Sequence, residues 1–226
     1  MPVRNELRTA AVPVPSTLSE ERPVAIPYQD RFLTGSLAVP HSPRAVVVIA
    51  NPRGYARHVP ALRALAGELR GAGLATLMVD VVLPNEEGVA ARPELLAARL
   101  DAARNWLETS RANGLPLVLL GMGMAAPAAL LSAAARPSQI GAVVACGPRP
   151  DSAGIALKMV SAPALLIAHS PFDDIDSHRR ALGQLEAPHD LIVLHDPGDP
   201  IAAAVDIAQT IRGFLTLFGS SARNAA

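Results

Sequence analysis

Short aliphatic runs recur along the chain and alternate with segments whose apolar residues are spaced three and four apart. The runs predict strands at 24–28, 31–39, 45–50, 74–82, 116–121, 140–146, 163–169 and 190–195. The inner runs, such as AVVVIA at 45–50, are continuously apolar. Continuous runs are typical of parallel strands that are covered on both faces. The pattern therefore predicts a largely parallel sheet between two layers of helices.

Helical spacing of apolar residues predicts helices around 62–69, 96–107 and 204–218. Pro93 and Pro200 precede the last two of these segments, and proline is favoured in the first turn of a helix. Two early strands followed by strand–helix–strand units predict one fold class, α/β. We expect a three-layer α/β/α sandwich with a doubly wound, mostly parallel sheet, an antiparallel edge and no cap domain.

The chain of 226 residues has room for one domain. Residues 1–23 are rich in proline, serine and charge and lack periodicity, so we expect an extended N-terminal arm. The domain is predicted over 24–220, and 221–226 form a C-terminal tail. No internal repeat is found.

The amino-acid composition of the chain excludes several classes of function. Lys+Arg and Asp+Glu both number 20, and aromatic residues make up 3%, so the chain lacks the basic surface and stacking rings of nucleic-acid binders. The single cysteine, Cys146, excludes an intrachain disulfide framework. No apolar run reaches the roughly 18 residues of a membrane span, and the N-terminus has no signal-peptide pattern. We therefore expect a soluble, cytoplasmic protein with no membrane partner.

Ligands of doubly wound sheets bind outside the carboxyl ends of the strands. The residues to consider therefore follow the predicted strands, and Cys146 itself ends a buried run, where we expect a small core residue. The segments after the other strands are 51–54, 80–87, 121–125, 169–174 and 196–199.

Several stretches occur in an order that is specific for one fold: VVVIANPRGYARH, LPLVLLGMGMAAPAALL, APALLIAHS and LIVLHDPGDP. Over about residues 30–220 the chain resembles the α/β-hydrolase superfamily, in particular its compact dienelactone-hydrolase-like branch. The resemblance implies a nucleophile at the centre of G-x-S-x-G on a sharp strand-to-helix turn, an acid after a later strand and a histidine before the last helix.

The resemblance places these roles on residues that do not suit them. Gly123 stands at the nucleophile position of the sequence GMGMA, and glycine has no side chain with which to attack a carbonyl carbon. The acid position falls on Phe172 or Asp173. The histidine position falls on Asp199, where an N-cap followed by Pro200 is the expected structural role.

The oxyanion loop of the family reads His-Gly, and here it is replaced by Asn51-Pro52. Proline has no backbone N–H, so one donor to a developing oxyanion is missing. We therefore expect a degenerate, non-catalytic member (a pseudoenzyme) without a cofactor, acting as a binding or assembly module. A protein partner, self-association and a small-molecule ligand all remain open. The expected pocket is lined by Asn51, Pro52, Arg53, Met122, Met124 and Phe172, of which the two methionines are expected to pack in the core.

An alternative is an active hydrolase of small esters or lactones with a rearranged site. Ser170 would be its nucleophile and His169 its base, with Asp173 or Asp199 as the acid. Against it, adjacent residues at the end of a strand point to opposite sides of the sheet, so Ser170 and His169 rarely meet.

Two further patterns are weak. GMGMAA fits a dinucleotide fingerprint, but it follows the third central strand and lacks an acidic residue about 20 positions later. His169, Asp173, Asp199 and His58 are types that bind Zn²⁺ or Mn²⁺, but no close ligand spacing supports a metal, and we expect none. The remaining histidines, His41, His178, His189 and His195, are expected in loops or on the surface.

Overall fold

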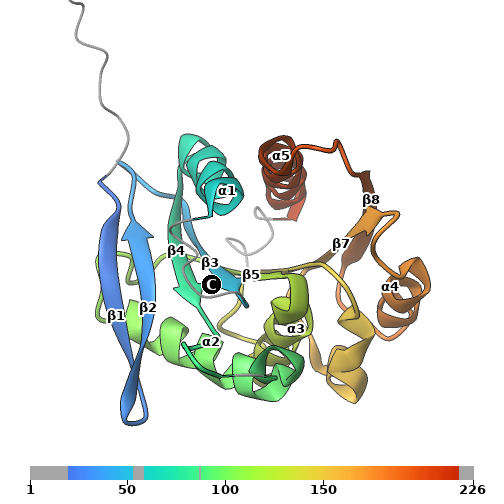
Figure 1. Cartoon of the computed structure of the whole chain (residues 1–226), viewed down its shortest axis with the longest axis horizontal. Helices are drawn as coiled ribbons and strands as arrows, with labels where there is room; N and C mark the ends of the chain where they lie inside the picture. Colours follow the sequence, from blue (N-terminus) through green and yellow to red (C-terminus); the bar gives the residue numbers. More distant parts are fainter. Residues whose placement is uncertain (1–19, 53–58, 87, 219–226) are drawn as a thin grey trace, which may run out of the picture.

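The computed structural model describes residues 20–52, 59–86 and 88–218, which form an eight-stranded sheet with helices on both faces (Figure 1). The strand order is β1-β2-β4-β3-β5-β6-β7-β8. The strands are β1 (Arg22–Tyr28), β2 (Arg31–Ala38), β3 (Ala45–Asn51), β4 (Leu74–Asp80), β5 (Leu117–Met122), β6 (Ala142–Cys146), β7 (Ala164–Ser170) and β8 (His189–His195). β1 and β2 are antiparallel to their neighbours, and all other pairs are parallel. The predicted fold class is confirmed.

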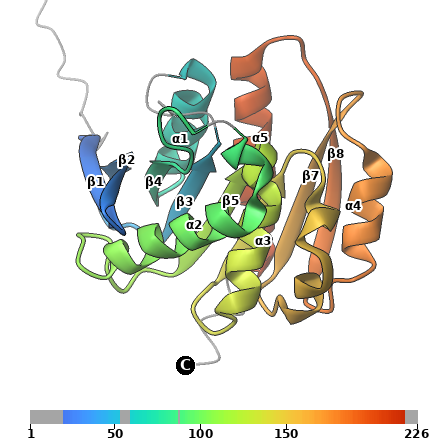
Figure 2. The same cartoon turned by 60° about the horizontal axis from the view of Figure 1, so that its bottom comes forward.

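Helices cover the sheet in two layers. α1 (Pro60–Gly71) and α5 (Pro200–Phe218) lie on one face, and α2 (Pro93–Leu107) and α3 (Ala126–Ala135) lie on the other, as Figure 2 also shows. α4 (Ile175–Leu182) packs on the same side as α3, beside β7 and β8. The short 3-10 segments are η2 (Val89–Ala91), η3 (Gly123–Ala125) and η4 (Pro150–Met159).

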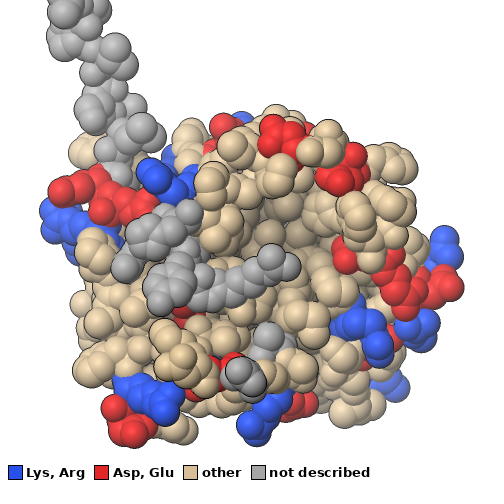
Figure 3. Space-filling view, in the orientation of Figure 1, with Lys and Arg blue, Asp and Glu red and all other residues tan. Residues whose placement is uncertain are grey.

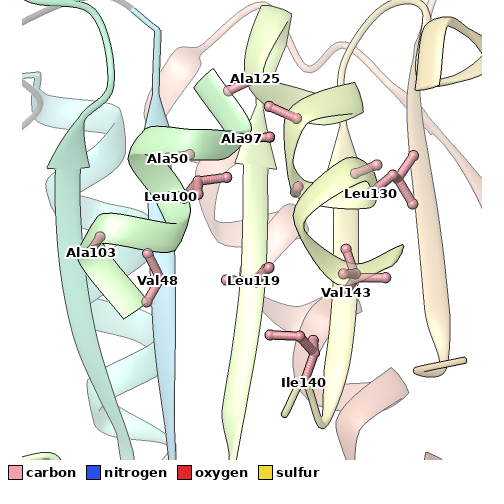
Figure 4. Packing of buried hydrophobic residues seen from close by; sticks show 14 of the residues in the cluster. Val48, Ala50, Ala97, Leu100, Ala103, Leu119, Ala125, Leu130, Ile140 and Val143 are labelled. Carbon is pink, nitrogen blue, oxygen red and sulfur yellow. The ribbon is translucent and has the colours of Figure 1, made fainter. Parts of the chain in front are cut away.

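Alternation along each strand divides the core into two clusters. In β3, Val48 and Ala50 belong to the cluster under α2 and α3, whereas Val47 and Ile49 belong to the cluster under α1 and α5. Figure 4 shows Leu100 of α2 in the first cluster with Val48 and Ala50. Both faces are buried, and that is why the sequence shows continuous apolar runs rather than alternating ones.

Among the described helices, α5 alone is long and apolar enough, by length and composition, to suit a membrane span. In the fold it carries a buried stripe toward the sheet and α1, formed by Ala204, Ile207, Ala208, Ile211 and Phe214. The i, i+3, i+4 spacing of this stripe is that of a helix packed on one side. Its predicted start at Pro200 is confirmed.

Candidate functional site

The ends of β3 to β8 meet at the carboxyl edge of the sheet, because these six strands run parallel. Figure 3 looks onto this edge and shows a hollow near its centre. Acidic side chains border the hollow, over the start of α5 and over the connection from β7 to α4. Exposed aspartates stand in both segments, among them Asp196 and Asp174.

The turn after β5 keeps the sharp backbone that a nucleophile would need. Gly123 has a φ of +55°, which side chains rarely adopt. A Cβ at Gly121 would lie 2.3 Å from the Ala125 carbonyl oxygen, and one at Gly147 would lie 2.6 Å from the Gly123 Cα. At Gly123 itself, a Cβ would lie 3.7 Å from Pro52 Cγ, its nearest neighbour among the residues that the structure describes. The described neighbours therefore leave room for a side chain at this turn, but glycine supplies none.

The residues after β3 and β4 are tied together beside this turn. Asn51 and Asp80 are buried, and the Asn51 amide donates a hydrogen bond to Asp80 Oδ1 at 3.4 Å. The Thr34 hydroxyl of β2 donates to Asp80 Oδ2 at 3.0 Å. These contacts hold Asn51 at the site, and the role of Thr34 could not be read from sequence because β2 and β4 are far apart in the chain. Arg53 and His58 lie outside the described residues.

The two methionines that flank Gly123 differ. Met122 is half-buried and packs against the cluster under α1 and α5. Met124 is 39% exposed, so the expectation of core packing is wrong for it. Met124 lies in η3, the 3-10 turn that begins at Gly123, and not in the buried strand. Phe172, also predicted to line a pocket, is 73% exposed.

Asp173 is the carboxylate that the turn after β7 brings inward. Its Oδ2 accepts the backbone N–H of His169 at 2.8 Å and lies 3.8 Å from His169 Nδ1. Burial alone would raise the pKa of Asp173, but the hydrogen bonds from His169 outweigh it and lower the pKa below its usual range. Sequence left the acid between Phe172 and Asp173. Of the two, Asp173 is the residue with a carboxyl group, and the structure turns that group back to His169.

The alternative hydrolase site is only partly assembled: His169 and Asp173 lie close together, but Ser170 does not join them. Leu165 and Ile167 of β7 face α1 and α5, whereas Leu166 faces the other layer. By this alternation His169 points to the α5 side and Ser170 to the α4 side, so their side chains diverge.

Asp199 is engaged as a helix cap. Its Oδ1 accepts the Ile201 backbone N–H at 3.0 Å, at the start of α5. The N-cap prediction for Asp199 is confirmed. The carboxylate is therefore held toward the helix backbone.

Cys146 is buried at the end of β6, on the same cluster as Met122. Burial, together with the charge of Asp173, raises the pKa of its thiol to about 12. The group is a neutral thiol near pH 7 and a poor nucleophile. The core role predicted from the sequence is confirmed.

His178 was expected at the surface, and this is wrong: it is fully buried in α4. Its Nδ1 lies 3.0 Å from the Asp174 carbonyl oxygen. Its Nε2 is buried without a hydrogen-bond partner. Ala181, three positions later, is also buried, and this helical spacing is the sequence signal that could have placed His178 inside.

The connection from β4 to α2 is fixed by an ion pair that sequence analysis missed. Arg99 of α2 is buried and donates to both oxygens of Glu86 at 2.6 and 2.7 Å. The hydrogen bond from Arg99 holds the pKa of Glu86 below its usual range. Arg99 also donates to the Val81 carbonyl at 2.8 Å, so it anchors the chain just beyond Asp80.

The described part of the chain contains no group of three or more His, Cys, Asp or Glu side chains that could hold a metal ion. His169 and Asp173 approach one another, but Asp199 is held at the start of α5.

Comparison with solved structures finds the same architecture in proteins named as hydrolases. The crystal structure of a dienelactone hydrolase from Anabaena variabilis matches with a TM-score of 0.78 and 32% identity, covering 88% of this chain and 98% of that one. An α/β serine hydrolase without a lid, from Xanthomonas campestris, matches with a TM-score of 0.68 and 17% identity over 87% of this chain and 94% of that one. At 17% identity, the likeness to the Xanthomonas campestris structure concerns the fold alone. No family model matches the chain.

Comparison with curated proteins finds a relative that is not named as a hydrolase. A protein of Mycobacterium tuberculosis, named "Putative phosphoribosyl transferase", is 43% identical over 139 residues, which are 60% of this chain. This chain spans 31% of the length of that relative. Most of the relative therefore lies outside the match.

Proposed function

Because this chain belongs to the dienelactone-hydrolase-like branch of the α/β-hydrolase superfamily, we propose that it is a member that binds rather than hydrolyses. The observation that carries the proposal is Gly123. The turn has a φ of +55°, and the described residues leave room above its Cα, but glycine projects no hydroxyl or thiol from it. Covalent catalysis at this turn needs such a group, because the nucleophile must bond to the carbonyl carbon.

The other parts of the reaction are also replaced. A carboxylate at Asp199 cannot take the place of a neutral imidazole base near pH 7, and it is engaged with the backbone of α5. Pro52, next to Gly123, has no N–H to offer an oxyanion. Cys146 is a thiol on a neighbouring strand, but its raised pKa keeps it protonated. These three features support loss of hydrolysis independently of Gly123.

The same edge of the sheet supports a binding role. Figure 3 shows the hollow at this edge. Met124, Phe172 and Ile201 expose apolar surface on the segments that follow β5, β7 and β8. We propose that the chain serves as a binding or assembly module. The relative from Mycobacterium tuberculosis, in which a similar segment is part of a much longer protein, supports a unit that works attached to or beside another protein.

Hydrolysis of p-nitrophenyl butyrate by the purified chain tests the proposal. We expect no rate above that of buffer, and no difference between the wild type and Ser170→Ala or Asp173→Asn. Rapid hydrolysis that one of these substitutions abolishes would overturn the proposal.

A second candidate is an active hydrolase that uses Ser170, His169 and Asp173. The observation that favours it is the pair of His169 Nδ1 and Asp173 Oδ2 at 3.8 Å, which is close enough to orient an imidazole. A fluorophosphonate probe with peptide mapping separates the two candidates. Labelling of Ser170 in the wild type, lost in His169→Ala, would support the hydrolase. An unlabelled Ser170 would remove its serine version.

A further inference from the structure

The two edges of the sheet are built differently. β1, at one edge, contains Pro23 and Pro27 and begins with Arg22. Prolines and cationic side chains on an edge strand prevent another strand from pairing with it. β8, at the opposite edge, has neither proline nor Lys or Arg, and its centre reads Leu-Ile-Val-Leu. β8 is therefore the edge without these protective devices.

β8 is also more exposed than the inner strands. None of its seven residues is buried, whereas all seven residues of β4 and all five of β6 are. Val193 at its centre is 42% exposed. β8 is the last strand of the sheet, and Figure 1 shows α4 beside it on one face.

The hydrogen bonds to β7 determine which backbone groups of β8 face outward. The Pro188 carbonyl accepts from Ala164 N–H, and Asp196 N–H donates to the Ser170 carbonyl. The even-numbered residues of β8 therefore face β7, and the N–H and C=O groups of residues 189, 191, 193 and 195 point to the open edge. One of these donors, Leu191 N–H, is held by its neighbour Asp190 Oδ1 at 2.8 Å.

We propose that β8 pairs in antiparallel orientation with β8 of a second copy of this chain, about a two-fold axis at Ile192. An axis there lets all seven residues of the strand overlap. It sets outward-facing residues opposite one another, as hydrogen-bonded antiparallel pairs require. Leu191 faces Val193 of the second copy, and Ile192 faces its own counterpart.

The self-complementary pattern H-D-L-I-V-L-H argues for a second copy rather than an unrelated partner. Paired about Ile192, five of its seven positions match: Ile192 faces itself, Leu191 faces Val193 and His189 faces His195, whereas Asp190 stands opposite Leu194. Such a contact uses the same patch on both subunits, so it closes as a dimer and does not propagate. Sixteen strands then form one continuous sheet. The pairing does not depend on whether the carboxyl edge hydrolyses anything.

Sedimentation analysis of the full chain tests the pairing. A contact centred on one strand is small, so concentrations up to on the order of 100 µM are needed. We expect a dimer for the wild type and a monomer for both Val193→Lys and Val193→Pro. The proline variant is diagnostic, because Val193 N–H points outward and its loss leaves the ladder to β7 intact. Leu217→Lys, at a residue 73% exposed on α5, is the matched control and should remain dimeric.

Asp190→Ala is a variant that we expect to strengthen the dimer rather than weaken it. It removes the carboxylate that competes for Leu191 N–H, so we expect the dimer dissociation constant to fall severalfold. Unfolding curves of each variant confirm that it is folded. A wild type that stays monomeric at all concentrations would overturn the proposal. So would a dimer that persists in folded Val193→Lys and Val193→Pro, since another surface must then hold it.

Discussion

Three glycines at the carboxyl edge are required for different reasons. Gly121 and Gly147 are fixed by space, because any Cβ would collide with backbone. Gly123 is fixed by conformation, since its φ is +55° and the nearest atom among the described residues would be an ordinary van der Waals neighbour. Glycine at 123 removes strain that a nucleophile in this turn has to bear. Glycine at this position therefore favours stability.

Alanine substitutions separate these effects. Gly121→Ala should destabilise the protein by about 3 kcal/mol, because the backbone of α3 cannot yield. Gly123→Ala should cost only about 1 kcal/mol of conformational strain. Urea unfolding measures both. Gly67→Ala, in the middle of α1 with free space, is the control and should stabilise by about 0.5–1 kcal/mol. Equal losses at 121 and 123 would contradict the packing argument.

Asp173 makes the free energy of unfolding depend on pH in the acidic range. Its pKa is lowered in the folded state, so the ionised carboxylate stabilises the fold at pH values above its unfolded pKa of about 3.9. That contribution is lost as the pH falls through the lower, folded value. The unfolding free energy of Asp173→Asn should therefore fall less steeply below about pH 4 than that of the wild type. Urea unfolding of both proteins across the acidic pH range measures this difference, and parallel curves would contradict it.

Helices at this edge begin on aspartate caps. Asp174 accepts the Asp176 N–H at the start of α4, and Asp199 does the same for Ile201 at the start of α5. In the family resemblance the second of these positions belongs to the catalytic histidine. A short carboxylate there satisfies an N-terminal donor and favours the helix dipole. The element is thus stabilised at a position where the reaction would require an imidazole.

The N-cap role of Asp199 predicts that substitutions by alanine and by asparagine change the unfolding free energy by different amounts. Asp199→Ala should lower the unfolding free energy by about 1 kcal/mol, whereas Asp199→Asn, which can also cap, should change it by a few tenths. Hydrogen exchange should show faster opening of the first turn of α5 in the alanine variant only. Equal exchange in both variants would mean that the cap contributes nothing.

At the scale of the molecule, hydrolysis would need parts from several strand ends at once. The turn after β5, the loop after β3 and the start of α5 each carry one replaced part. The sheet brings these segments together, so a single restored side chain leaves the others missing. The proposed binding role therefore rests on residues from several strand ends rather than on Gly123 alone.

Restoring two groups should therefore fail. Gly123→Ser with Asp199→His supplies a hydroxyl and an imidazole, but Pro52 still denies an oxyanion donor, and loss of one such donor costs about 100-fold or more in rate. We expect p-nitrophenyl butyrate hydrolysis at least about 100-fold below that of an intact dienelactone hydrolase assayed beside it. Unfolding curves verify that the double variant is folded. A rate like that of the intact enzyme would show that Pro52 is not limiting.

The sequence by itself determined the layered α/β fold and the empty nucleophile position, because strand runs, helix spacing and the residue at 123 are local properties of the chain. It also gave the cap at Asp199, since a cap and its helix are neighbours. Tertiary structure decided which acid turns inward, that His178 is buried, and that Met124 is exposed. Those outcomes depend on contacts between distant segments and on how each turn leaves its strand, which local patterns do not encode.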